Sequence, residues 1–514
     1  MFQFIDTKLM LLSAVLVAIY VYLKFCVYNY WKKYNVPHDN PSIPLGNVPV
    51  SYFFGRVHLA KIIKNSYVKF CRYPFHGMYF LHKPVLMIND PDLIQTILIK
   101  EFHKFADRGW FTDKRVDPMS ANLFFQPYAK WRRLRTKFSP SFSPVKLRQI
   151  YPLLEEVSDS MIKACDDLLK KTDVVDVKDL FVRYTVDVIS STVYGFNCNS
   201  FENPDNQFRR YGIKALDFGR ISMLFIFFIP EVLQSIILPA FGVNIREFFN
   251  KIFIESVTHR RKEKIERKDF MSLLMQLMDK GHIEDNDSSL SSDDKIEDVD
   301  PLSMEEAAAQ AFVFFLGGFE TPSAVSTNCL LELAMHPEVQ QKLQQEIDTV
   351  LEKNPSGLTY DCISEMQYLD MVFNETLRKH PPGAFLNRIC LEDFQIPGSD
   401  FTIPKGMRLL ISLSGLHNDP EHYPNPSRFD PERFTKENVD SRSTCMHIGF
   451  GDGPRNCIAK SLGMLKSKQA LVALLRNYTF RVCDKTNLPT SCSTESYVQI
   501  PEQSVLLSFK KRRE

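Results

Sequence analysis

The residues of this chain best suited to chemistry form a short stretch near the C-terminus, Phe450 to Ala459, with the sequence FGDGPRNCIA. Gly451 and Gly453 can adopt backbone conformations that other residues avoid, and Pro454 stiffens the turn. Cys457 ends this turn, where an apolar and basic pattern predicts the start of a helix. Free amides and the helix dipole at such a position favour a thiolate.

A thiolate held in a glycine-rich turn can be the axial ligand of a haem iron, because it pushes electron density onto the iron and favours O–O cleavage. Arg455 adds a cation two residues before Cys457. The alternative for a lone cysteine is a buried, inert thiol beside a surface turn. The spacing of Phe450, Gly453, Arg455 and Cys457 decides between them, since it resembles the haem-binding loop of the cytochrome P450 family. Ala459 stands where that family usually has Gly, and we expect slightly altered helix packing rather than loss of binding.

A basic helix is predicted from Tyr128 to Phe138, YAKWRRLRTKF, and it spaces Trp131 and Arg135 one turn apart on the same face. An indole N–H and a guanidinium placed there can reach one anionic group. From the residues alone, an ordinary basic surface helix is the alternative. The Trp-x-x-x-Arg pair resembles the family helix that binds the haem propionates. Four other residues of the helix are expected to form a basic face, either for an acidic redox partner or simply solvated: Lys130, Arg132, Arg133 and Lys137.

A long helix is predicted to begin at the capping box of Ser303 and Glu306 and to reach about Met335, a length of about 48 Å at 1.5 Å per residue. Within it a Gly costs about 1 kcal/mol and a Pro about 3 kcal/mol. Three such residues lie there: Gly317, Gly318 and Pro322. We expect a local distortion of the helix next to a ligand.

Glu320 and Thr321 are polar residues in this otherwise apolar segment. With freed backbone carbonyls they could hold water and pass protons while dioxygen is activated. An isolated Thr more commonly bonds back to its own helix. GGFET nevertheless resembles the family's oxygen-activation motif. Pro322 departs from that motif, because a small hydroxyl residue is more usual there.

Glu375 and Arg378 lie three residues apart on a helix predicted to end before Pro381. An exposed pair of this kind contributes only tenths of a kcal/mol. ETLR resembles the family's Glu-x-x-Arg, which an Arg of a later segment locks into a buried network. That segment is present as FDPERF, with Arg433. The resemblance implies a structural role in supporting the thiolate loop.

Short strands are predicted around Tyr79, including VLMIND, and after Pro382 in AFLNRICL, FQIPG, FTIPKG and RLLISL. The resemblance makes Arg108 and Arg388 further propionate ligands and places Pro382 to Leu386 along the pocket. Four aromatic residues are candidate pocket walls, with plain core packing the equal alternative: Phe124, Phe125, Phe312 and Phe315.

Leu9 to Tyr28 is almost wholly apolar and long enough to cross a bilayer as a helix. No small-x-small site follows, which disfavours a cleaved signal peptide. An aromatic and basic flank then places the remaining chain in the cytosol: Tyr28, Tyr30, Trp31, Lys32 and Lys33. We predict a membrane anchor over 1–31, a stiff proline-rich hinge over 32–50 and a cytosolic domain over 51–514.

The composition of the 514 residues, with 44% hydrophobic residues, allows a large core. A net charge of +2 gives no reason to expect nucleic-acid binding. The eleven cysteines show no zinc spacing and indicate reduced thiols in the cytosol. Ile221 to Phe241 predicts two short helices at the membrane interface over the substrate entrance, or a buried hairpin. Asp285 to Asp300 predicts a mobile surface loop.

Together these motifs are similar to those of microsomal cytochrome P450s, most closely in appearance to insect members that metabolise xenobiotics. The resemblance implies a mainly α fold with a small β region (α+β) and one N-terminal transmembrane helix in the endoplasmic reticulum membrane. It implies haem b (iron protoporphyrin IX) as cofactor and insertion of one oxygen atom from dioxygen into lipophilic small molecules. Electrons would come from NADPH through NADPH–cytochrome P450 reductase, with cytochrome b5 a further candidate partner.

Two other classes of protein remain as alternatives. A haem-thiolate isomerase or dehydratase needs no reductase, and Glu320 and Thr321 argue against it. A non-catalytic binding protein would keep the fold, and Ala459 and Pro322 are its only hints.

Overall fold

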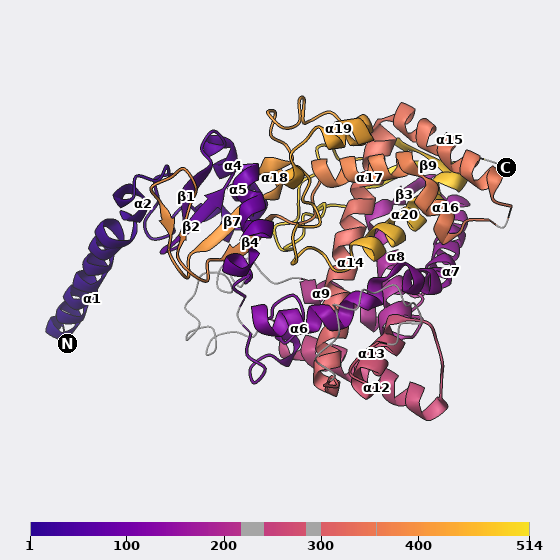
Figure 1. Ribbon diagram of the computed structural model, residues 1–514, viewed down its shortest axis with the longest axis horizontal. Coiled ribbons are helices and arrows are strands. Elements are labelled where there is room, and N and C mark those ends of the chain that lie inside the picture. The colour runs from indigo at the N-terminus through magenta and orange to yellow at the C-terminus, as the bar shows by residue number, and fades with distance from the viewer. Residues whose placement is uncertain (1, 111, 217–240, 284–299, 356, 513–514) are drawn as a thin grey trace.

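The computed structural model describes residues 2–110, 112–216, 241–283, 300–355 and 357–512. Figure 1 shows a helical body, a sheet region on its N-terminal side, and a helix, α1 (Phe2–Tyr22), that projects from this region. The predicted mainly α class with small sheets is confirmed. The segments 221–240 and 285–299 lie outside the described residues, so the roles predicted for them stay predictions.

Most of the described helices follow one another along the chain without a strand between them, and the short strands come in small groups. The helices are α2 (Tyr30–Lys33), α3 (Val50–Phe53), α4 (Leu59–Phe70), α5 (Pro91–Gln95), α6 (Tyr128–Phe138), α7 (Pro144–Leu169), α8 (Val177–Ile189), α9 (Gln207–Leu216), α12 (Val243–Glu263), α13 (Phe270–Asp279), α14 (Met304–Met335), α15 (Pro337–Lys353), α16 (Tyr360–Glu365), α17 (Gln367–Lys379), α18 (Leu413–Leu416), α19 (Lys436–Asp440) and α20 (Lys460–Asn477). The strands are β1 (Phe75–Phe80), β2 (Lys83–Ile88), β3 (Val174–Asp176), β4 (Phe385–Ile389), β5 (Phe394–Gln395), β6 (Thr402–Ile403), β7 (Arg408–Ser412), β8 (Tyr478–Val482) and β9 (Leu506–Lys511).

The largest sheet joins parts of the chain that are far apart in sequence. Its strand order is β1-β2-β7-β4. Strands β2 and β7 pair in parallel, with Val85 opposite Arg408, and the other pairs are antiparallel. The sheet therefore fixes Arg388 on β4 relative to the N-terminal part of the domain.

Helix α14 runs through the helical body, packed against α8 and α20 (Figure 1). It begins at the predicted capping box, in which Ser303 and Glu306 bond reciprocally. The predicted distortion of its course is not seen, because the helix is continuous through Gly317, Gly318 and Pro322. Pro322 has no N–H to offer to the carbonyl of Gly318, so one backbone hydrogen bond of the helix is missing there.

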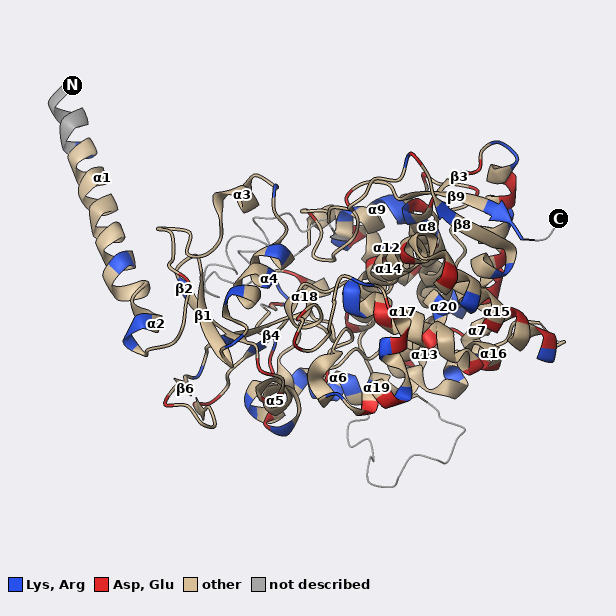
Figure 2. Cartoon of the chain, turned by 90° about the horizontal axis from the view of Figure 1, so that it is seen from above, with Lys and Arg blue, Asp and Glu red and all other residues tan. Residues whose placement is uncertain are grey.

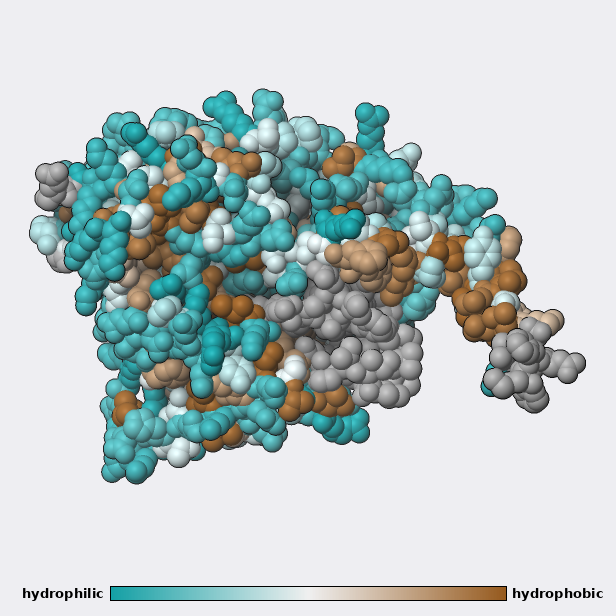
Figure 3. Space-filling model, turned by 180° about the vertical axis from the view of Figure 1, so that it is seen from behind, coloured by the Kyte–Doolittle hydropathy of each residue, from teal (hydrophilic) through white to brown (hydrophobic). Residues whose placement is uncertain are grey.

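The N-terminal segment Lys8–Lys33 is the one described segment long and apolar enough to cross a membrane. Figure 3 shows apolar residues gathered on this projecting segment. At the base of this segment, Trp31 of the predicted aromatic flank is fully buried, and its Nε1 donates to the carbonyl of Met78 at 3.0 Å. A Cβ at Gly77 would lie 2.3 Å from the indole, so the glycine admits Trp31 against β1. The anchor is thus joined firmly to the sheet.

His76 on β1 makes the stability of the domain depend on pH. It is fully buried, accepts a hydrogen bond from Asn89 Nδ2 at 3.0 Å and contacts Ser66 Oγ at 2.8 Å. Burial lowers its pKa from 6.5 to about 3, so the unfolded chain binds a proton below pH 6.5 that the folded chain does not. Its contribution to the free energy of unfolding should fall by up to about 1.4 kcal/mol per pH unit as pH decreases below 6.5.

This dependence can be measured by denaturant unfolding between pH 6.5 and 5 in the wild type and in His76→Asn. We expect a shallower dependence in the variant. His103→Asn, at an exposed position, is the control. Equal slopes in the wild type and His76→Asn would contradict the expectation.

Candidate active site

The loop Phe450 to Ala459 is a tight turn whose glycines are sterically required. Gly451 and Gly453 have φ of +74° and +69°. A Cβ at Gly453 would lie 2.0 Å from the carbonyl oxygen of Leu98, so no other residue fits there. The N–H of Cys457 donates to the carbonyl of Phe450 at 2.8 Å and closes the turn. Helix α20 begins at Lys460, three residues after the cysteine, as the sequence predicts.

The thiol of Cys457 is accessible, yet burial is the largest influence on its pKa, so it faces the interior of the protein and not bulk solvent. Burial raises the pKa of Cys457, whereas the sequence predicts a favoured thiolate. The backbone N–H of Ala459 and the charges of Arg108 and Arg135 act in the opposite direction. The helix terminus alone therefore does not outweigh desolvation, and a positive partner at the sulfur is required for a stable thiolate.

Four guanidinium groups from four parts of the chain gather at this loop, and Arg455 of the loop is one of them. Arg108 Nη2 donates to the carbonyl of Arg455 at 2.9 Å. Arg135 on α6 donates to the carbonyl and the side chain of Asn456, at 2.8 and 2.7 Å. Arg388 is buried on β4. Burial lowers the pKa of each of these guanidinium groups, and for Arg108, Arg388 and Arg455 the charge of a neighbouring arginine lowers it further, so the folded chain concentrates like charge in this guanidinium cluster.

Two members of the guanidinium cluster keep hydrogen-bonding capacity unused. Burial and neighbouring arginines lower the pKa of Arg455 to about 8 and that of Arg388 to about 9. Nε and Nη1 of Arg455 and Nε of Arg388 are buried and bond to no residue in the described ranges. A buried cation whose N–H groups are not all hydrogen-bonded is costly, even where, as for Arg455, one nitrogen lies 3.8 Å from the carboxylate of Asp107. A group with two carboxylates beside Cys457 would satisfy them, and haem, with two propionates and an iron for the thiolate, fits this donor set.

Helix α6 brings Trp131 to the guanidinium cluster, whereas one residue of its predicted basic face is buried. Trp131 is buried, and its ring lies 4.6 Å from the guanidinium carbon of Arg455, so it stacks on a cation. Lys137 was expected on the basic face but is buried, because its Nζ donates to the carbonyls of Gly281 and Asp300 at 3.0 and 2.8 Å. Lys130, Arg132 and Arg133 remain exposed, and Figure 2 shows basic residues along α6.

Helix α14 presents Gly317 and Thr321 on one face, one turn apart. A Cβ at Gly317 would meet no described atom within 4 Å, so the helix borders open space there. The hydroxyl of Thr321 donates to the carbonyl of Gly317 at 2.6 Å, the bond back to the helix that the sequence left open. Glu320 Oε2 accepts a hydrogen bond from Ser496 at 2.7 Å. No pattern around Ser496 indicated this contact.

The four candidate pocket aromatics divide into two groups. Phe124 stacks on Arg108 of the guanidinium cluster at 4.3 Å, and Phe125 packs on Trp110 at 4.8 Å. Phe312 and Phe315 are fully buried, and both pack on Phe249 of α12, with ring centroids 5.0 and 4.7 Å apart. Their role as pocket walls stays a prediction.

No motif in the sequence indicates Trp110 or Tyr497 as residues of the site. Their rings pack together at 6.4 Å, and the Arg108 charge acts against the burial that raises the pKa of Tyr497 to about 12. Tyr497 comes from a C-terminal segment without a recognisable motif, so only the fold brings it to the site.

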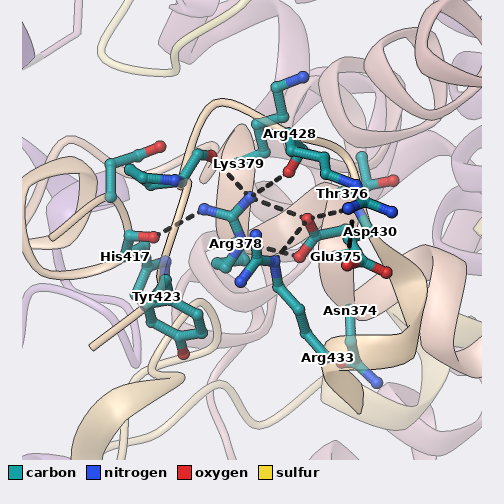
Figure 4. Close-up of polar contacts among 12 residues, drawn as sticks. Asn374, Glu375, Thr376, Arg378, Lys379, His417, Tyr423, Arg428, Asp430 and Arg433 are labelled. Carbon is teal, nitrogen blue, oxygen red and sulfur yellow. Dashed lines mark hydrogen bonds and ion pairs between the residues drawn. The ribbon is translucent and has the colours of Figure 1, made fainter. Parts of the chain in front are cut away.

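Glu375 and Arg378 on α17 are fully buried and form the centre of a polar network, shown in Figure 4. Arg378 donates to both carboxylate oxygens of Glu375, at 2.7 and 2.8 Å, and to the carbonyl of His417 at 2.9 Å. Arg433 lies 3.5 Å from Glu375, so the three predicted members come together. The N–H of Asp430 also donates to Glu375, which ties the FDPERF segment to the helix.

Substitution of Arg388 tests whether this residue binds haem, because it should weaken haem binding without destabilising the haem-free chain. We expect Arg388→Leu to weaken haem binding about tenfold or more, because a hydrogen bond to a charged group contributes about 1.5–3 kcal/mol. The haem-free chain should be no less stable, since the repulsion from Arg108 is lost. Haem transfer to apomyoglobin measures the first effect and thermal unfolding of the haem-free chain the second. Arg132→Leu, on the exposed face of α6, is the control. If Arg388→Leu lost its haem to apomyoglobin at the wild-type rate, Arg388 would not be a haem-binding residue.

A helical fold around an interior cysteine loop, with buried cations suited to two propionates, defines a haem-thiolate enzyme. The family model for Cytochrome P450 matches residues 43–508, so the chain belongs to the cytochrome P450 family and is a monooxygenase of that class. Cytochrome P450 6A1 of Musca domestica is 35% identical over 507 residues, 97% of each chain. Probable cytochrome P450 6a14 of Drosophila melanogaster is 37% identical over 94% of this chain and 96% of its own. Cytochrome P450 6k1 of Blattella germanica is 35% identical over 98% and 97%.

Proposed function

We propose that this P450 inserts one oxygen atom from dioxygen into lipophilic small molecules such as xenobiotics, plant toxins, insecticides or endogenous lipids and hormones. Electrons come from NADPH through NADPH–cytochrome P450 reductase, and cytochrome b5 is a further candidate donor. The segment Lys8–Lys33 anchors the chain in the endoplasmic reticulum membrane, with the domain on the cytosolic side. The observation that carries the proposal is the guanidinium cluster beside Cys457, in which Arg388 and Arg455 keep buried N–H groups that bond to no described residue.

The residues of the site have separate roles in this proposal. Cys457 binds the haem iron, and the arginines hold the propionates: Arg108, Arg135, Arg388 and Arg455, with Trp131 stacked on the last. Bound haem supplies the iron centre at which dioxygen is activated. The backbone carbonyl of Phe450 closes the loop by accepting a hydrogen bond from the N–H of Cys457.

Thr321 and Glu320 serve proton delivery. Because the hydroxyl proton of Thr321 is given to the carbonyl of Gly317, the Thr321 oxygen can only accept further hydrogen bonds, and it is suited to hold a water. Glu320, one residue before, supplies a titratable carboxyl group whose position depends on Ser496. The pair can thus hold a water and move its proton at the face of α14 that borders open space.

The test is turnover of a panel of lipophilic substrates by the full chain in membranes. We expect product only with NADPH and reductase together, with one oxygen atom of each product labelled from ¹⁸O₂. Conversion without NADPH would instead identify an isomerase or dehydratase. Ligand-induced spectral shifts without any product would identify a binding protein.

A further inference from the structure

Lys466 on α20 is a buried cation to which the proposed mechanism gives no role. Its side chain is only 2% exposed, and its Nζ donates to the backbone carbonyl of Gly318 on α14. It forms no ion pair with a carboxylate anywhere in the described ranges. A buried lysine with a carbonyl as its partner is costly, so an ordinary packing role would be better filled by an apolar residue.

The carbonyl that Lys466 contacts is one that the helix itself leaves without a donor. In an α-helix the carbonyl of residue 318 would accept from the N–H of residue 322, and that residue is Pro322. Lys466 therefore replaces the missing donor from a neighbouring helix. Gly318 keeps the space for this contact, since a Cβ there would lie 3.3 Å from Nζ and 3.2 Å from Ile189.

Lys466 also connects the two functional segments of the site. Helix α20 begins directly after the Cys457 loop, and Gly318 lies two residues before Glu320 on α14. Burial lowers the pKa of Lys466 to about 7, and the Cys457 charge acts in the opposite direction. The hydroxyl of Tyr184, on α8, donates a hydrogen bond to the backbone carbonyl of Lys466 and not to its side chain. Helix α20 thus carries this amine on the element that follows the Cys457 loop, and its bond to Gly318 ties that element to α14.

We propose that Lys466 is a positioning residue that holds the Gly318 carbonyl of the GGFET segment and presents a positive charge towards the Cys457 thiolate. It compensates for Pro322 and keeps Thr321 and Glu320 in register with the thiolate loop. This inference rests on the proposed role of Cys457 as the iron ligand.

The experiment compares Lys466→Met, which removes donor and charge, with Lys466→Gln, which keeps a donor without charge. Lys468→Met is the matched control, because Lys468 is also buried on α20 but pairs with Asp370. The readouts are product formed per NADPH consumed and the haem reduction potential. We expect the Met variant to form roughly tenfold less product per NADPH, as for loss of one charge-assisted hydrogen bond. Both variants should have a lower potential than the wild type, because a cation near the thiolate is lost.

A second comparison isolates the link to Pro322. Pro322→Ala restores an N–H for the Gly318 carbonyl. When Lys466→Met is added to Pro322→Ala, the product formed per NADPH consumed should therefore fall much less than it does in Lys466→Met alone. If Lys466→Met alone fails to bind haem, recovery of haem by the double variant supports the proposal. The proposal would be overturned if both Lys466 variants kept the wild-type product per NADPH and the wild-type haem reduction potential. It would also be overturned if Lys468→Met lost as much of both as Lys466→Met. The wild-type spectrum is the independent check: without a red-shifted Soret band for its reduced carbon monoxide complex, the proposed function itself fails.

Discussion

Cys457→Ser is expected to abolish oxygenation completely, together with the strongly red-shifted Soret band of the reduced carbon monoxide complex. Both require a thiolate on the iron, and a serine hydroxyl at this position cannot provide one. The loop itself should survive, because the turn is closed by the N–H of residue 457 and by the close packing of Gly453 on Leu98, neither of which the substitution changes. The measurement is a carbon monoxide difference spectrum of dithionite-reduced membranes, with haem content determined separately.

The control for this substitution is Cys71→Ser. Cys71 is only partly exposed and lies at the end of α4, with its thiol near the carbonyl of Val68 at 3.5 Å. It should keep the band and the activity of the wild type. A red-shifted band retained in Cys457→Ser would show that another residue holds the iron, and the roles given to the loop would then be wrong.

The parts of the site that could be predicted from the sequence are those fixed by local backbone geometry. Gly451 and Gly453 have the positive φ that their spacing implied, and the capping box of Ser303 and Glu306 starts α14 where the pattern placed it. Glu375 and Arg378 are set three residues apart on one helix, so their contact follows from the helical repeat. Such features depend on few neighbours, and a short motif specifies them.

What the sequence could not predict depends on elements far away in the chain. Lys137 has the pattern of a solvated lysine, but carbonyls from two later segments surround its amine. Trp31 was expected at a membrane interface, yet the missing side chain of Gly77 opens a site for it on the sheet. Lys466 has a role only because Pro322, on another helix, frees a carbonyl. In each case the partner is a backbone group, which carries no sequence signal.

Arg378→Ala is expected to lower the free energy of unfolding by about 3–5 kcal/mol, because it leaves the Glu375 carboxylate buried without its main partner. Both side chains are fully buried, and Arg378 also holds the carbonyls of His417 and Pro426 at 2.9 Å (Figure 4). Arg433, 3.5 Å from Glu375, cannot replace a bidentate pair. The measurement is denaturant unfolding of the haem-loaded protein, followed by fluorescence and by haem release.

The matched control is Lys342→Ala, which removes an exposed ion pair. Lys342 lies 2.6 Å from Glu432, but both side chains are about half exposed. Water screens such a pair, so the loss should stay below about 1 kcal/mol. Haem release should follow unfolding in Arg378→Ala, because His417, which this arginine holds, also accepts the N–H of Ile448 at 3.1 Å, two residues before Phe450. A loss as small as that of Lys342→Ala would mean that the network does not support the thiolate loop.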